Sequence, residues 1–161
     1  MFLHTDMRKL SSDFHPIRPL TNYEIDEYGK KNIPHWCGVF MRDELVGLLD
    51  LRLQPHPWAK PTQCTVVNLD SSSGFGTHWV CFYLDQKNKV YFDSFGSLPP
   101  EEILQLFELR STSGGHERGS YERNSLEIQP RDSVICGHMC LFVLENLAYG
   151  ESFQDILSYI I

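Results

Sequence analysis

The sequence predicts a single α+β domain in which a small mixed β-sheet is flanked by helices. Three observations lead to this prediction. The chain has 161 residues, 42% of them hydrophobic and 22% charged, which is typical of one globular domain with one core. Segments rich in β-branched and aromatic residues lie in the middle of the chain, and segments with helical periodicity lie toward both ends. We therefore treat residues 1–161 as one domain, with residues 1–16 as an extended arm.

The first half of the chain predicts one helix and one strand. Thr21 is followed three residues later by Glu24, a spacing typical of a capping box at the start of a helix over residues 22–31. Three prolines predict an irregular loop over 52–63, and the β-branched content of 64–69 predicts a strand. On the buried side of the helix we expect Tyr23, Ile25, Tyr28 and Gly29.

An antiparallel hairpin and a helix follow. Residues 78–84 and 89–93 are apolar, and the short polar segment 85–88 that joins them is typical of a hairpin turn. Two prolines then precede a helix over 101–109, which has acidic residues in its first turn. Its apolar residues recur at helical spacing: Ile103, Leu106 and Phe107.

The last third of the chain predicts a surface loop, a short strand and two helices. The loop covers 110–120, the strand 126–129, and the first helix 136–149, which is strongly apolar and ends at Gly150. A final amphipathic helix carries the apolar residues Phe153, Ile156, Leu157 and Ile160. Because 136–149 is so apolar, we expect it to be the central buried helix.

Charge and cysteine usage narrow the classes of partner. The formal net charge is −7 and no cluster of Lys or Arg stands out, so nucleic acid is disfavoured as a partner. The apolar run 139–144 is too short to cross a bilayer, and residues 1–6 do not resemble the start of a secretory signal. The five cysteines have no disulfide-framework spacing. We expect a monomer that is not secreted and not bound to membrane, located in the cytoplasm or nucleus.

Cys136 is the first candidate for chemistry. It stands where a turn gives way to the apolar helix, and a thiol at a helix N-terminus is stabilised as thiolate by free amides and by the helix dipole. Gly137 follows, and its missing side chain would let a substrate carbonyl approach the backbone. Gly137 is a candidate substrate contact, as is Trp79, which could shield the thiol and a neighbouring base from water. The alternative for Cys136 is a buried structural cysteine.

His78 and Asp93 are candidates to act with that thiol. His78 begins the first hairpin strand, and its imidazole can accept the thiol proton and return it to a leaving amine. Asp93 ends the second strand, so the hairpin can bring its carboxylate back to the imidazole and fix the tautomer. The alternatives are an ordinary surface histidine and an aspartate that caps a turn.

Gln129 lies seven residues before Cys136, and its side-chain amide is a candidate oxyanion donor together with the Cys136 amide. The chain order is therefore His, Asp, Gln, Cys. This order differs from that of the papain family, in which the cysteine comes first, and residues 134–137 (Val-Ile-Cys-Gly) differ from the caspase signature.

The local sequences around these four residues resemble the adenovirus maturation protease family (adenain). They also resemble its wider clan, the ubiquitin-like-protein-specific cysteine proteases. The resemblance rests on residues 76–79 (Gly-Thr-His-Trp), on 91–96 (Tyr-Phe-Asp-Ser-Phe-Gly) and on the step from Gln129 to Cys136 and Gly137. It extends over about residues 20–148 and points to a viral or transposon-encoded relative.

The resemblance implies the fold and the role of each matching residue. Cys136 would be the nucleophile at the N-terminus of the central helix, His78 the general base and acid, Asp93 the orienting acid and Gln129 an oxyanion donor. It implies an endopeptidase that cuts viral precursor proteins at glycine-containing sites, in the cytoplasm or nucleus of the host cell or packaged in the virion. Two departures are that Asp93 stands where adenain has glutamate, and that no cysteine between Cys81 and Cys136 is present to bind a disulfide-linked activating peptide.

Other functions stay open at this point. A deubiquitinase or ubiquitin-like-modifier isopeptidase of the same clan would use the same four residues. An acetyltransferase is disfavoured by the lack of a basic patch, and an inactive peptide-binding module by the full set of four residues. A metal site at Cys136, His138 and Cys140 is disfavoured because His138 points about 200° away from Cys136 on a helix. We expect His138 to lie at the surface or to face a loop, and we expect no metal or organic cofactor.

Overall fold

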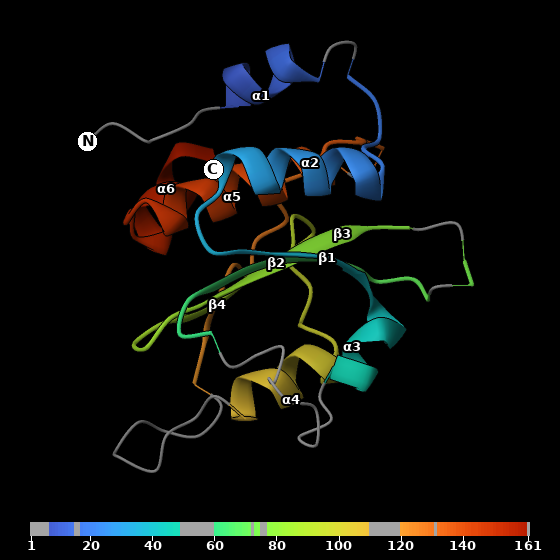
Figure 1. The fold of residues 1–161 in the computed structure, drawn as a ribbon. Helices are drawn as coiled ribbons and strands as arrows, with labels where there is room; N and C mark the ends of the chain where they lie inside the picture. Colours follow the sequence, from blue (N-terminus) through green and yellow to red (C-terminus); the bar gives the residue numbers. More distant parts are fainter. Residues whose placement is uncertain are drawn as a thin grey trace.

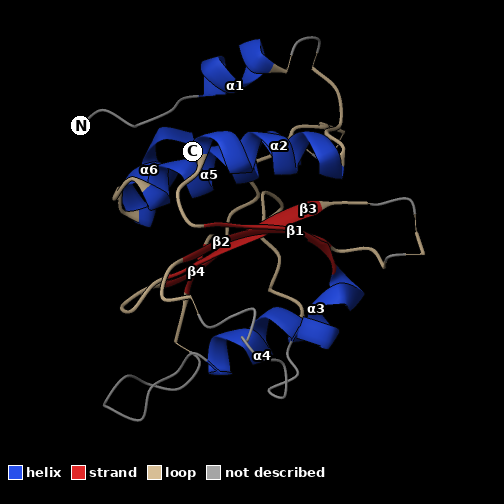
Figure 2. Cartoon of the chain, viewed as in Figure 1, coloured by secondary structure: helices blue, strands red, loops and turns tan. Residues whose placement is uncertain are grey.

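In the computed structural model, a five-stranded mixed sheet runs through the middle of the molecule (Figures 1 and 2). The structure describes residues 7–14, 17–48, 60–71, 73–74, 77–109, 120–130 and 132–160. The strands follow one another across the sheet in chain order: β1 (Trp36–Met41), β2 (Gln63–Asn68), β3 (Trp79–Leu84), β4 (Lys89–Phe92) and β5 (Glu122–Arg123). The two outer pairs, β1 with β2 and β4 with β5, are parallel, and the inner pairs are antiparallel.

Helices cover both faces of this sheet (Figure 1). Four lie on one face: α1 (Met7–Asp13), α2 (Asn22–Asn32), α5 (Cys136–Ala148) and α6 (Phe153–Ile160). Two lie on the other: α3 (Arg42–Leu48) and α4 (Glu101–Leu109). The α+β prediction, with a small mixed sheet flanked by helices, is confirmed.

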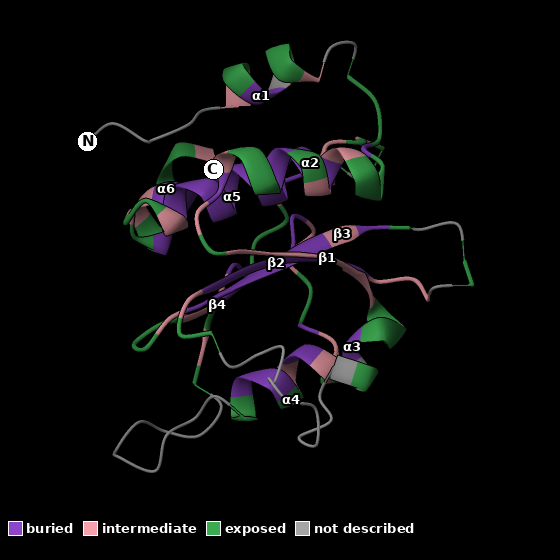
Figure 3. Cartoon of the chain, in the orientation of Figure 1, coloured by how far each residue is buried: buried purple, intermediate pink, exposed green. Residues whose placement is uncertain are grey.

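The central strands are buried on both faces because each face is covered by helices (Figure 3). Successive side chains of a strand point to opposite faces. In β3, Cys81 and Tyr83 join the core beneath α5, whereas Val80 and Phe82 join the core beneath α4. Because the side chains on both faces of these strands are buried, the strands appear as continuous apolar runs in the sequence.

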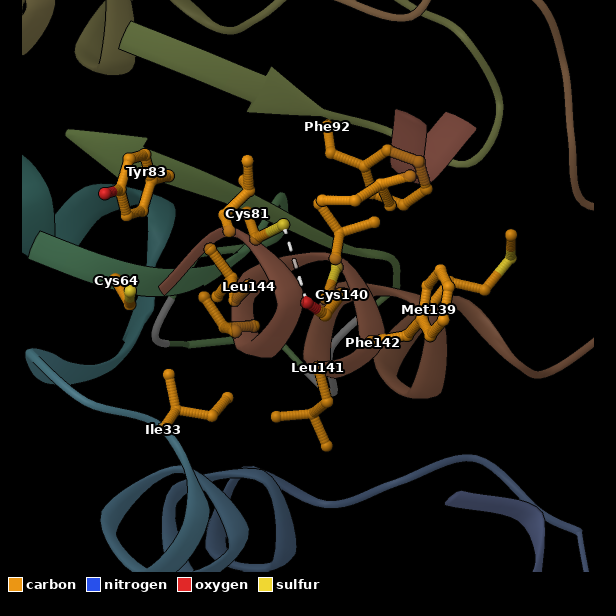
Figure 4. Close-up of a cluster of buried hydrophobic side chains, with 14 of the residues drawn as sticks. Ile33, Cys64, Cys81, Tyr83, Phe92, Met139, Cys140, Leu141, Phe142 and Leu144 are labelled. Carbon is orange, nitrogen blue, oxygen red and sulfur yellow. Dashed lines mark hydrogen bonds between the residues drawn. The ribbon is translucent and has the colours of Figure 1, made fainter. Parts of the chain in front are cut away.

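Helix α5 lies at the centre of the larger core. Every residue from Gly137 to Leu147 is buried, and α5 packs directly against β3 (Figure 4). The Cys81 thiol points at the α5 backbone and donates to the carbonyl of Cys140 at 3.9 Å (Figure 4). This packing ties the start of α5, where Cys136 stands, to the strand that follows His78.

Helix α2 begins as the sequence predicts. The Thr21 side chain accepts from the Glu24 amide, and the Glu24 carboxylate accepts from the Thr21 amide, so the capping box is confirmed. Ile25, Tyr28 and Gly29 are buried as expected. The prediction for Tyr23 is wrong, because its side chain is 80% exposed. It lies two residues before Ile25, which is about 200° away around the helix.

The N-terminal segment departs from the expected extended arm. Residues Met7–Asp13 form helix α1, and Leu10 within it is fully buried against the larger core. Burying a leucine side chain is worth about 1.5–3 kcal/mol, which favours docking of a short amphipathic helix over an extended arm. Residues 1–6 and 15–16 of the expected arm lie outside the described residues.

Three further elements differ from expectation. The sequence did not predict β1 or α3, which follow each other without a turn. The expected strand at 126–129 is wrong, and the last strand is instead Glu122–Arg123. Residues 126–129 do not pair as a strand; instead, the amides of Ile128 and Gln129 both donate to the carbonyl of Ser94. These two hydrogen bonds hold residues 128–129 against the end of β4.

The remaining elements agree with the sequence to within one or two residues. The hairpin of β3 and β4, helix α4 with its three buried apolar residues, α5 and the amphipathic α6 are all confirmed. The 110–120 loop lies outside the described residues except for Ser120, and most of the 52–63 loop lies outside them too. No helix among the described residues has the length and apolar character needed to cross a membrane.

Candidate active site

The hairpin brings His78 and Asp93 together. His78 immediately precedes β3 and Asp93 immediately follows β4, so the antiparallel pairing places both at the same end of the hairpin. The His78 Nε2 atom lies 2.7 Å from Asp93 Oδ1, and both side chains are buried. Because this carboxylate can only accept, His78 Nε2 carries the donated proton. Its other ring nitrogen is then left to face the thiol.

Asp93 is itself held firmly. Its Oδ1 atom also accepts from the Phe95 amide at 2.8 Å. The side chain of Asn124 binds the Asp93 backbone on both sides: its Nδ2 donates to the Asp93 carbonyl at 2.5 Å, and its Oδ1 accepts from the Asp93 amide at 3.2 Å. The carboxylate therefore has little freedom to turn away from His78.

Cys136 lies at the first position of α5, where its thiol interacts with the imidazole of His78. The residue at the N-cap position, Ile135, makes no side-chain capping hydrogen bond. The amides of Trp79 and Gly137 bond to the sulfur instead. Three groups that stabilise negative charge therefore converge on the thiol.

The electrostatics of the pair favour thiolate and imidazolium. Burial alone would raise the pKa of Cys136, but the hydrogen bond from His78 and those from the two amides outweigh it and hold that pKa below its ordinary value of 9.0. Burial alone would lower the pKa of His78, but the hydrogen bonds to Asp93 and Cys136 raise it to about 9. At a pH above the lowered pKa of Cys136 and below the raised pKa of His78, the sulfur is charged and the imidazole is protonated.

Gln129 is buried and lines the same cleft as Cys136. Its Nε2 donates to the carbonyl of Ser133 at 2.7 Å, and its Oε1 accepts from the hydroxyl of Ser94 at 2.6 Å. The side-chain amide is thus fixed in one orientation, with one of its two N–H groups engaged by Ser133.

A cleft of about 940 Å³ opens over these residues. His78, Gln129 and Cys136 line it, together with Trp79. The Trp79 indole donates to the carbonyl of Leu20 at 3.1 Å, so this wall of the cleft is held by a hydrogen bond to the segment before α2. The site can therefore hold an extended chain against the sulfur.

Gly137 is required for packing. A Cβ atom at this position would lie 3.2 Å from Cδ1 of Trp79, 3.3 Å from Cδ1 of Ile25 and 3.4 Å from Cβ of Leu20. The missing side chain therefore admits Trp79 and its neighbours, which is a different reason from the close approach of a substrate that the sequence suggested. The Gly137 amide still faces the thiol.

Sequence reasoning missed three residues that hold the site. Phe95 stacks on His78 with ring centroids 4.3 Å apart and ring planes 10° apart. Asn124 fixes Asp93, and Ser94 bonds to Gln129. Phe95 and Ser94 directly follow Asp93 in the sequence, and this adjacency could have indicated that they belong to the site. No sequence pattern could have indicated Asn124, because it lies 31 positions from its partner Asp93.

The Cys136, His138 and Cys140 set does not form a metal site. Within the described residues, no group of three or more His, Cys, Asp or Glu side chains gathers around a common point. Of the two placements expected for His138, the surface is wrong: the residue is fully buried, and its ring meets Phe14 of the segment after α1 edge-on, with centroids 5.6 Å apart. Burial lowers the pKa of His138.

The chain is similar in sequence to a curated viral protein. No protein-family model matches the chain. Among curated proteins, "Putative thiol protease R355" of Acanthamoeba polyphaga mimivirus is 31% identical over 102 residues, which cover 58% of this chain. That match spans only about a third (32%) of the length of the mimivirus protein.

Solved structures resemble the chain over most of its length. The ASFV pS273R protease aligns over 89% of this chain and 62% of its own, with a TM-score of 0.61 and 19% identity. The SUMO protease Ulp1, with its catalytic cysteine oxidised to a sulfinic acid, aligns over 96% and 77%, with a TM-score of 0.54 and 18% identity. The chain has the fold of these cysteine proteases. The resemblance to the ubiquitin-like-protein-specific protease clan is confirmed at the level of fold.

Proposed function

We propose that this chain is a cysteine endopeptidase that acts as a monomer, with Cys136 as nucleophile. The observation that carries the proposal is the hydrogen bond between Asp93 and His78 at the wall of the cleft that Cys136 also lines, where His78 and Cys136 interact. These three side chains come from two strand ends and a helix start that are separate in sequence. Such an arrangement matches the requirements of a nucleophile, its base and an orienting acid.

The first half of the reaction would proceed as follows. The Cys136 thiolate attacks the carbonyl carbon of the scissile peptide, and the carbonyl oxygen becomes an oxyanion. The Gln129 side chain and the Cys136 amide donate to that oxyanion. The His78 imidazolium then gives its proton to the leaving amine as the C–N bond breaks, which leaves a thioester on Cys136.

The second half restores the enzyme. His78, now neutral, takes a proton from a water molecule that attacks the thioester carbonyl. The C–S bond breaks, the new carboxyl end of the substrate leaves, and the thiolate again pairs with the imidazolium. Asp93 keeps the same imidazole nitrogen protonated throughout and stabilises its positive charge.

We infer that the substrates are protein chains cut at glycine-containing sites, and that viral precursor proteins are the favoured class. The fixed position of Trp79 supports a preference for small substrate residues near the scissile bond. A bulky substrate side chain would require Trp79 to move, and the hydrogen bond of its indole to the Leu20 carbonyl opposes that movement. The names of the mimivirus thiol protease and the ASFV protease support a viral setting. Such an enzyme would work in the cytoplasm or nucleus of the host cell or inside the virion.

A modifier isopeptidase is the second candidate. The observation that favours it is the likeness to Ulp1, which is named as a SUMO protease and aligns over 96% of this chain. The chemistry at the sulfur would be the same. The two candidates differ in whether the substrate is recognised by a short extended segment alone or also by a folded modifier.

Two sets of reactive probes separate these candidates. One set carries short peptides that end in Gly-Gly with a vinyl ester, and the other carries whole ubiquitin-like modifiers with the same reactive end. Labelling of Cys136 by the short peptides supports the precursor-processing enzyme, and labelling only by whole modifiers supports the isopeptidase. The Cys136→Ala variant is the control for both. Absence of any adduct at Cys136 with every probe would contradict both candidates.

A further inference from the structure

We propose that Ser94 is a positioning residue that holds the side-chain amide of Gln129 with its NH₂ group toward the cleft. This inference rests on the proposed function, because it concerns the oxyanion donor of that reaction. Ser94 itself is fully buried and does not line the cleft, so it would act only through Gln129.

The hydrogen bonds decide the orientation of the Gln129 amide. The carbonyl oxygen of Ser133 can only accept, so the atom 2.7 Å from it must be the Gln129 nitrogen. The Gln129 oxygen then faces Ser94, whose hydroxyl donates to it at 2.6 Å. Among the described residues Gln129 donates from one N–H group to Ser133, which leaves the second N–H for an oxyanion in the cleft.

Ser94 also holds the backbone of the same segment. Its carbonyl accepts from the amide of Ile128 at 2.8 Å and from the amide of Gln129 at 3.0 Å. Ser94 therefore fixes the position of Gln129 and, together with the Ser133 carbonyl, the direction of its side chain. The backbone contacts of Ser94 do not involve its side chain, so Ser94→Ala removes only one of the two contacts that set the amide direction.

Burial makes that contact costly to lose. Gln129 is 1% exposed, so water cannot readily replace the Ser94 hydroxyl at the Gln129 oxygen. An acceptor left unsatisfied in the interior costs about 1–3 kcal/mol, and turning the amide toward another donor would relieve this cost. The turn would aim the oxygen, rather than the nitrogen, at the place where the oxyanion forms.

The position of Ser94 gives a second possible role that the test must separate. Its neighbours Asp93 and Phe95 both contact His78. A substitution at Ser94 that disturbed the whole turn would weaken the imidazolium and the thiolate. One that acted through Gln129 would leave that ion pair intact.

The experiment is a double-mutant cycle on peptide hydrolysis. Ser94→Ala is expected to lower kcat about tenfold with KM little changed, since removal of a whole oxyanion donor costs about 10²–10³-fold. In a Gln129→Ala background, Ser94→Ala is expected to have no further effect on kcat. Ser94→Cys, which fills nearly the same space with a weaker donor, should lower kcat in the same way. Ser158→Ala, an exposed serine of α6, is the matched control and should leave kcat unchanged.

The second readout is the pH dependence of Cys136 alkylation by iodoacetamide, followed by mass spectrometry of the Cys136 peptide. Alkylation forms no oxyanion, so the Ser94→Ala profile should overlie that of the wild-type chain. An altered profile, or an equal loss of kcat in the wild-type and Gln129→Ala backgrounds, would overturn the role of Ser94. If Gln129→Ala itself leaves hydrolysis unchanged, the oxyanion role of Gln129 fails and the role of Ser94 fails with it, while the proposed protease activity stands. If the wild-type chain hydrolyses no peptide, the proposed function itself fails.

Discussion

The ring of Phe95 lies flat on the imidazole of His78, with centroids 4.3 Å apart and planes inclined by only 10°. The Phe95 amide also donates to the carboxylate oxygen that accepts from His78. One residue therefore contacts both the imidazole and the acid that orients it. The aromatic face stabilises a positive charge on the imidazole and prevents the ring from turning toward the cleft.

Replacing Phe95 by leucine should weaken the imidazolium while keeping most of the packing. A cation–π contact is worth about 1 kcal/mol at a partly exposed site, which corresponds to about a fivefold fall in kcat/KM. The alkaline limb of the pH–rate profile should move to lower pH, because the pKa of His78 falls. Phe107→Leu, in the core on the other face of the sheet, is the control and should lower stability without moving the profile. An unmoved profile in Phe95→Leu would show that the stack only fills space.

The wild-type chain should show a bell-shaped dependence of kcat/KM on pH. The rate rises as the Cys136 thiol ionises, and this occurs below its ordinary pKa of 9.0. It falls as His78 loses its proton near pH 9, because the leaving amine then lacks its proton donor. The measurement is the rate of peptide hydrolysis as a function of pH, over both the rising and the falling side of the profile. A rate that keeps rising above pH 10 would show that a protonated imidazole is not required.

Asp93→Asn should narrow this bell from both sides. Without the carboxylate the pKa of His78 falls, and with a weaker imidazolium beside it the pKa of Cys136 rises. A charge-assisted hydrogen bond contributes about 1.5–3 kcal/mol, so kcat/KM should fall roughly 10- to 100-fold. His78→Ala removes the proton donor itself and should reduce turnover to background while the fold survives. A larger loss from Asp93→Asn than from His78→Ala would contradict these roles.

Gly137→Ala should impair the cleft more than the fold. The new methyl group would press on Trp79 and Leu20, so we expect kcat/KM to fall about fivefold or more as the wall shifts. The free energy of unfolding should change by less than about 2 kcal/mol, because alanine is the better helix former by about 1 kcal/mol. Gly47→Ala in α3 is the matched control, since an added Cβ there meets no described atom within 4 Å. Equal activity in both variants would contradict the packing role of Gly137.

Much of the fold follows from local sequence. The β3–β4 hairpin was predictable because its turn is stabilised locally: the Asp85 side chain accepts from the amides of Lys87 and Asn88. Helix α2 was predictable because Thr21 and Glu24 cap each other. Helix α1 was not, because only its docking through Leu10 stabilises so short a helix. Strand β1 pairs in parallel with a segment far along the chain, so no local pattern marked it.

For the candidate site too, some residues could be predicted from the sequence and others could not. His78, Asp93, Gln129 and Cys136 could be proposed because chemistry restricts which residue types act at a thiol, and because their order and local sequences resemble a known family. The structure brings the first two into contact and links His78 to Cys136. The residues that hold them could not be proposed from sequence, because serine, asparagine and phenylalanine are common and their contacts form only in the folded chain.

The account depends on Cys136 as the attacking group, and trapping of the covalent intermediate tests this most directly. The chain would be mixed with a peptide ester, quenched in acid during turnover, and mapped by mass spectrometry. We predict a single acyl adduct as a thioester on Cys136, absent from the Cys136→Ala variant, which should fold but not cleave. An adduct on another residue, or cleavage of the peptide by the Cys136→Ala variant, would contradict the account.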